Sequence, residues 1–265
     1  MATGRTLEKW ARVYVDGYDL SGYGRSIGPL LWEFDTADLT APMSDAVKGV
    51  LPNHCNISPG VFNGVMQSTT DSGVEVSRIQ TAGVTRDIMI PIGIRAAPAA
   101  GDPVYVCKAS HGGLHVVEDA GAMAINATFG GWDVSDLPSY TSPWGVLVHA
   151  LGAETAANTG DGVNNGWTTT TGGMFAYQVT SVTREEATNM VIKLQSCASA
   201  DGDFADVTGA TVTIETTDVT AGIIQVASSV TVYQYVRWQA VVTGVISVTF
   251  AMAWIPNTAT GVWPT

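Results

Sequence analysis

Apolar and polar residues alternate in short runs along the last third of the chain, and this pattern predicts strands. The runs between residues 174 and 254 are MFAYQVTSV, MVIKLQS, ATVTIET, GIIQVA, VYQYVRWQAVV and ISVTFAMAW, with turns such as ADGDF and TTDVTAG between them. In YQYVRWQ, a two-residue period places Tyr235 and Arg237 on one face and Trp238 on the other. The pattern therefore predicts a β-sandwich over this part of the chain.

The first half of the chain contains further strand-like runs. Residues 12–34 (RVYVDGYDLSGYGRSIGPLLWEF) predict a strand, a turn at Asp16-Gly17 and a second strand, because Asp-Gly suits a tight turn. Strand patterns resume at VFNGVMQS, RDIMIPIGIR, PVYVCKAS, LHVVED and AMAINATF. Residues 35–60 are less regular, and Ser44 could cap a short helix over DAVKGVL.

Two polar loops divide these patterns into two groups. The first loop is DVSDLPSYTSP at residues 133–143, and the second is ETAANTGDGVNNGWTTTTGG at residues 154–173. We therefore expect an all-β fold with two domains. Residues 1–140 form the first, with an irregular arm near 35–60, and residues 141–265 form a second β-sandwich that begins at WGVLVHAL.

Composition limits the functions that the chain can have. The chain has 265 residues, a formal net charge of -12 and only 12 Lys and Arg residues, which do not form a run. Nonspecific or sequence-specific nucleic-acid binding is therefore not expected, since phosphate neutralisation needs clustered basic side chains. Charged residues make up 14% of the chain and Gly contributes 29 residues, which favours strands and turns over surface helices.

The cysteines and the longest uncharged run bear on the cellular compartment. Cys55, Cys107 and Cys197 lie far apart and suggest free thiols made in a reducing cytoplasm, and the start of the sequence lacks an apolar signal-peptide core. The 18 uncharged residues between Arg237 and Pro256 approach the length of a membrane span. Their polar interruptions and alternation predict two strands joined near residues 243–244 instead, and no membrane span.

Two loops resemble ligand sites at first sight. GYGRSIG at residues 22–28 has closely spaced glycines, but a phosphate loop needs a following helix N-terminus, and no helical pattern follows. Asp201, Asp203 and Asp206 could surround a calcium ion, although the glutamate of an EF-hand loop is absent. We favour a turn for the first segment and a hairpin loop with Phe204 tucked under it for the second.

Histidines and aromatic residues provide no complete site either. His111 and His115 in HGGLH would share one face of a strand, but a zinc site needs further ligands that the sequence does not supply. No G-x-S-x-G pattern marks a hydrolase nucleophile. Trp32, Trp238 and Trp254 lie inside strand patterns, which favours core or subunit contacts over a glycan platform. We expect no catalytic residue, cofactor or metal, and no enzymatic activity.

The segment RVYVDGYDLSGYGRSIGPLLWEF resembles the opening of tail tube and related virion proteins of tailed bacteriophages, in which a strand, a V-D-G-x-D-L-S-G turn and a second strand begin the chain. The pattern from GGMFAYQVTSV to ISVTFAMAWI resembles the β-sandwich module that often ends such proteins. This resemblance implies a tail-tube-like first domain and a non-enzymatic structural subunit, most plainly of the tail tube, that is made in the bacterial cytoplasm and assembles with itself and with other virion proteins.

The low charge supports self-assembly independently, because long strand edges need cover and repeated subunits can cover one another in a ring. Two alternatives remain. A capsid decoration or other virion surface protein would use the same sandwich on a shell, and a glycan-binding module would need exposed aromatic side chains.

Overall fold

The computed structural model describes residues 10–22, 24–38, 50–65, 83–94, 96–119, 122–132, 142–186 and 188–257. In these ranges the chain forms strands and turns and no α-helix, so the expected all-β fold is confirmed. The strands are β1 (Tyr14–Val15), β2 (Tyr18–Asp19), β3 (Gly24–Gly28), β4 (Leu31–Asp38), β5 (Val50–Ser58), β6 (Val61–Val65), β7 (Thr85–Pro91), β8 (Pro103–Asp119), β9 (Ala122–Trp132), β10 (Trp144–Glu154), β11 (Asn158–Thr159), β12 (Val163–Asn164), β13 (Gly173–Arg184), β14 (Asn189–Cys197), β15 (Ala205–Ile214), β16 (Thr220–Val226), β17 (Tyr235–Thr243) and β18 (Ile246–Pro256).

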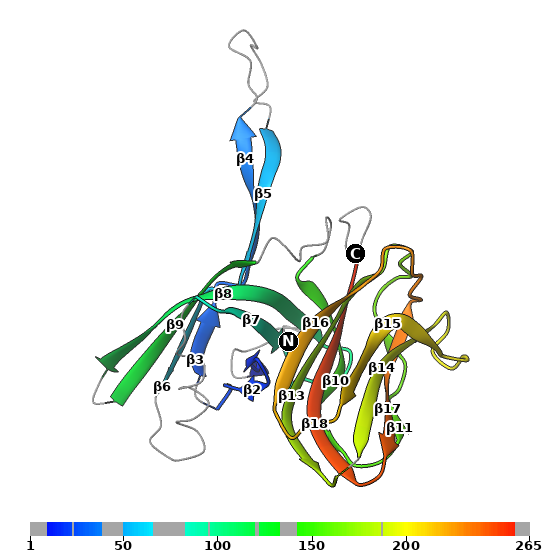
Figure 1. The fold of residues 1–265 in the computed structure, drawn as a ribbon. Coiled ribbons are helices and arrows are strands. Elements are labelled where there is room, and N and C mark those ends of the chain that lie inside the picture. The colour runs from blue at the N-terminus through cyan, green and yellow to red at the C-terminus, as the bar shows by residue number, and fades with distance from the viewer. Residues whose placement is uncertain are drawn as a thin grey trace, which may run out of the picture.

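The C-terminal strands form a β-sandwich (Figure 1). One sheet contains β16, β13, β18 and β10 in that order, and the other contains β15, β14 and β17 with the short strands β11 and β12. Their inner faces enclose a core that includes Phe175, Trp238 and Phe250. Trp238 is buried whereas Tyr235 and Arg237 are half-buried, so the predicted alternation along β17 is confirmed.

Strands at the centre of the first sheet are buried on both faces. On β18, Trp254 belongs to the sandwich core, while its neighbours Ala253 and Ile255 belong to a second core on the other side of the sheet. A strand with two buried faces needs no polar face, which explains why the run between Arg237 and Pro256 is uncharged. This run forms β17 and β18, as predicted. Within the described part of the chain, no helix has the length and apolar character to cross a membrane.

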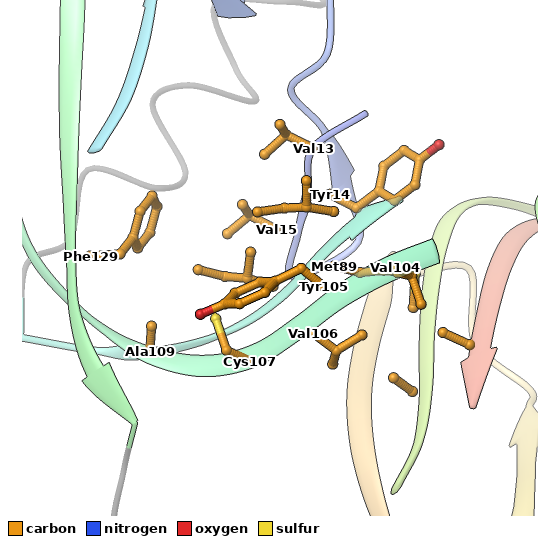
Figure 2. Packing of buried hydrophobic residues seen from close by; sticks show 14 of the residues in the cluster. Val13, Tyr14, Val15, Met89, Val104, Tyr105, Val106, Cys107, Ala109 and Phe129 are labelled. Atoms are coloured by element: carbon orange, nitrogen blue, oxygen red, sulfur yellow. The ribbon is translucent and has the colours of Figure 1, made fainter. Parts of the chain in front are cut away.

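The second core joins the first sheet of the sandwich to strands from the N-terminal half. The long strand β8 pairs with β7 and β10 near its start and with β9 further along, and the sheet continues from β7 to β1 and β2. Figure 2 shows Tyr105 and Cys107 of β8 among Tyr14, Val15 and Met89. Burial raises the pKa of the Cys107 thiol, so this cysteine acts as an apolar core residue.

One sheet runs across residue 140, where the sequence predicts a domain boundary. Tyr105 of β8 lies opposite Trp144 of β10, and their rings meet edge to face with centroids 5.2 Å apart. The two halves of the chain therefore share a sheet as well as a core. The division into domains 1–140 and 141–265 stays a prediction.

Candidate assembly surface

A two-stranded ribbon projects from the body of the molecule (Figure 1). β4 and β5 pair antiparallel from Leu31 opposite Ser58 to Asp38 opposite Val50. Within the described residues, neither strand pairs with a third strand. The sequence predicts an irregular arm near residues 35–60. For the described part of this segment the prediction of irregular structure is wrong, because residues 35–38 and 50–58 belong to the paired strands β4 and β5. The helix predicted after Ser44 lies outside the described residues except for its last two positions, which belong to β5.

Two glycines pair at the base of the ribbon, just before β4 begins and just after β5 ends. Gly28 and Gly60 form a parallel bridge, and Gly60 has a φ of 67°. A Cβ atom on Gly60 would lie 2.6 Å from the carbonyl carbon of Gly28 and 2.8 Å from the carbonyl oxygen of Pro29. Glycine is required at position 60 for both reasons, since it tolerates a positive φ and allows close backbone approach.

The body of the molecule holds this base through buried groups. The Tyr105 hydroxyl donates to the Leu31 carbonyl at 2.7 Å, and the Ser58 hydroxyl donates to the Phe129 carbonyl at 2.7 Å. Ile57, next to Ser58, is 2% exposed and belongs to the second core. These contacts connect the first and last residues of the ribbon to β8 and β9, so its direction is set by the core.

A four-stranded sheet extends from the body on the side away from the sandwich (Figure 1). The distal half of β8 pairs with β9, β9 pairs with β6, and β6 pairs with β3. In the part of the chain that the structure describes, β3 has a partner on one side only. β3 is therefore the edge strand of this sheet within the described residues.

The segment V-D-G-Y-D-L-S is a tight hairpin that its own side chains stabilise. Asp16 and Gly17 have φ values of 50° and 84°, as a two-residue Asp-Gly hairpin turn requires. The Asp19 carboxylate accepts from the Ser21 N–H, and the Ser21 hydroxyl accepts from the Val13 N–H, both at 2.9 Å. The predicted turn at Asp16-Gly17 is confirmed, and its polar residues have local structural roles.

The tip of this hairpin docks against the sandwich through Gln178 of β13. The Gly17 N–H donates to Gln178 Oε1 at 2.7 Å, and Gln178 Nε2 donates to the Asp87 carbonyl at 2.9 Å. Gln178 is 2% exposed, and a Cβ on Gly17 would lie 2.7 Å from the Val179 carbonyl oxygen. Sequence reasoning missed this contact, although a glutamine within the apolar run MFAYQV was a signal that could have revealed it.

The glycine-rich segment at residues 22–28 has no phosphate-loop geometry in its described residues. Residues 24–28 form β3, and the next described element is β4. A helix N-terminus is what presents several N–H groups to a phosphate, and the element that follows β3 is a strand. The turn predicted for this segment is wrong for residues 24–28, because they pair with β6 as a strand.

The two histidines of HGGLH differ in environment. His111 is fully buried beside Phe129, with ring centroids 5.3 Å apart, whereas His115 is exposed. The expectation that both share one face of a strand is wrong, because the register of β8 shifts on either side of His111. No group of three His, Cys, Asp or Glu side chains within the described residues is placed to hold a metal ion.

The aspartate loop is a hairpin that is fastened to the outer face of the second sheet. Asp206 accepts from Lys193 Nζ at 2.7 Å and from Gln195 Nε2 at 2.8 Å, and both hydrogen bonds, that of Lys193 first, lower the pKa of its carboxyl. The Arg237 guanidinium lies 4.3 Å from the centroid of the Phe204 ring. The predicted hairpin is confirmed by the antiparallel pairing of β14 with β15, and Phe204 is half-buried against Arg237.

Tryptophans of the sandwich are core residues. Trp238 is 7% exposed and Trp254 is fully buried, as their strand patterns predict. The side chain of Trp32 lies outside the part that the structure describes. The described tryptophans of β17 and β18 therefore provide no exposed platform for a glycan.

Comparison with known proteins gives little further information. No protein-family model matches the chain, and no curated protein matches it. Among solved structures, the chain is similar to Dit (gp 19.1) of SPP1, described as a paradigm of the hub adsorption apparatus in phages that infect Gram-positive bacteria. The two share 10% sequence identity with a TM-score of 0.33, over 91% of this chain and 98% of the other. A TM-score this low does not establish a common fold.

Proposed function

We propose that the chain is a non-enzymatic structural subunit of a bacteriophage tail, and that it assembles with copies of itself into a ring, as the tail tube does. The observation that carries this proposal is the projecting ribbon of β4 and β5. It combines with the sequence resemblance to tail tube proteins, which rests on residues 12–34 and on the sandwich pattern. The subunit is then part of the virion, with synthesis in the host cytoplasm and other virion proteins as further partners.

Physical chemistry supports a neighbour for the ribbon. A two-stranded hairpin alone is at best marginally stable in water, and it normally needs a third strand or a packing surface. The ribbon of β4 and β5 pairs over seven residue pairs and has unpaired outer edges within the described residues. A second subunit in a ring would supply the missing surface, and it would do so identically for every copy.

The sheet that contains β3 offers a second surface that a neighbour could cover. It extends away from the sandwich, and Val116 of that sheet is 44% exposed. β3 itself is a short edge strand that carries an arginine and a register shift between Gly24 and Ser26, and such features discourage pairing with another chain. The proposal therefore rests on the ribbon.

Removal of the ribbon tests the proposal. Residues 34–55 are replaced by Asn-Gly, which joins Glu33 directly to its cross-strand partner Asn56 and keeps the base with Ile57 and Ser58. We expect purified full-length protein to form rings in negative-stain micrographs and to have the mass of a ring in light scattering. The truncated chain should remain folded by circular dichroism and stay monomeric.

A truncated chain that forms the same rings would refute the role of the ribbon. Full-length protein that stays monomeric at high concentration would refute ring assembly altogether. Discrete particles that bind to empty capsids would support a decoration protein instead. The thermal unfolding curve of the truncated chain is the control, because loss of folding would make its assembly uninformative, and a milder cut at Thr36 opposite Pro52 then replaces it.

A further inference from the structure

The sandwich buries a histidine, His149, where the register of β10 is irregular. The pairing of β10 with β18 shifts between Leu147 and His149 and again between His149 and Gly152. The imidazole stacks on Phe250 with ring centroids 4.2 Å apart, and it meets the Trp238 ring edge to face at 4.4 Å. His149 is 7% exposed, so these two rings largely exclude water from it.

Both ring nitrogens of His149 face acceptors. Nδ1 lies 3.0 Å from the Phe250 carbonyl oxygen, and Nε2 lies 3.3 Å from Glu154 Oε1. The other oxygen of Glu154 accepts from Asn158 Nδ2 at 3.1 Å. A carbonyl oxygen and a carboxylate can only accept, whereas a neutral imidazole has a single N–H. Both contacts can therefore be hydrogen bonds at the same time only when the pair of His149 and Glu154 carries one proton more than a neutral imidazole and a carboxylate do.

Burial and Glu154 shift the pKa of His149 in opposite directions. Burial lowers the pKa of His149 from 6.5, and the hydrogen bonds to Glu154 and to the Phe250 carbonyl, with the charge of Glu154, offset part of this decrease. The rings that pack on the imidazole from β17 and β18 do not titrate, so Glu154 is the charged group that faces it from the described residues. Above the pKa of His149, the imidazole must give up one of its two contacts.

We propose that the contact between His149 and Glu154 is a proton-dependent latch on the corner between β10 and β11. The latch is closed when the pair holds the additional proton and open when it does not. The contact to Phe250 persists in the open state, because it is the shorter one and its carbonyl is buried. Glu154 lies nearer to the surface, with 18% of its side chain exposed, and can turn to water with Asn158. This inference does not depend on the proposed function.

Two substitutions at Glu154 separate the open and closed states. In Glu154→Gln the side-chain amide donates to the neutral imidazole, so the latch should stay closed without the proton. In Glu154→Ala the latch should stay open. Both variants remove the carboxylate that favours the imidazolium, so each should lower the pKa of His149 in an NMR titration of the imidazole resonances. Glu215→Gln, at an exposed position of the same sandwich, is the matched control.

Amide hydrogen exchange of residues 155–158 reports whether the latch is open or closed, once the pH dependence of the intrinsic exchange rates has been corrected for. In the unmodified protein, protection of this corner should increase as the pH falls through the pKa of His149. Protection should be high in Glu154→Gln and low in Glu154→Ala at every pH. Protection that is independent of pH in the unmodified protein would overturn the proposal, and so would an unchanged pKa of His149 in both Glu154 variants.

Discussion

Replacement of Gln178 by leucine should destabilise the fold because Gln178 joins the two halves of the chain. Leucine leaves the buried Gly17 N–H without its acceptor and removes one of the two donors to the Asp87 carbonyl, whose other donor is the Asp16 N–H. A buried donor that loses its partner costs about 1–3 kcal/mol, and the loss at Asp87 is smaller because one hydrogen bond remains. We expect a decrease of about 2–3 kcal/mol in the free energy of unfolding.

Differential scanning calorimetry measures this change. For a chain of this size, about 2–3 kcal/mol corresponds to a decrease in Tm of roughly 5–10 °C. The matched control is Gln225→Leu, because Gln225 is exposed on the neighbouring strand β16. Amide exchange at Gly17 should also accelerate in Gln178→Leu alone. An unchanged Tm in this variant would refute the view that the hydrogen bonds of Gln178 hold the hairpin of β1 and β2 on the sandwich.

Two further predictions concern the base of the ribbon and the buried histidine. Gly60→Ala should lower the Tm more than Gly209→Ala in thermal unfolding. Both glycines have a positive φ (67° and 87°), but of the two only Gly60 would bring a Cβ atom against backbone atoms. Equal decreases in Tm would exclude steric crowding as the cause. Because burial lowers the pKa of His149 from 6.5 in the folded chain, the unfolded chain binds the proton first, and the free energy of unfolding should fall as the pH decreases through 6.5. Urea unfolding at several pH values checks this, and His149→Gln should have a flatter profile; a profile as steep as that of the unmodified protein would contradict the assignment.

Local patterns were sufficient wherever the structure depends on neighbours in sequence. The Asp16-Gly17 turn follows from the residues at the turn, and the two faces of β17 follow from a two-residue period. The same period failed at His111, because bulges in β8 interrupt it and no residue type marks them reliably. The pairing of β4 with β5 was not predicted, because it joins two segments that are separate in the sequence and the local pattern of each segment does not show its partner.

The amino-acid sequence by itself therefore determined the all-β class, the sandwich strands and the chemistry of the tight turn, because each depends on residues within a few positions of one another. Tertiary structure alone decided which strands are buried on both faces and which polar groups become buried partners. Gly17 and Gln178 are 161 residues apart, and His149 reaches Phe250 across 101 residues. Such contacts depend on how sheets pack, and packing brings together positions that the local pattern treats as independent.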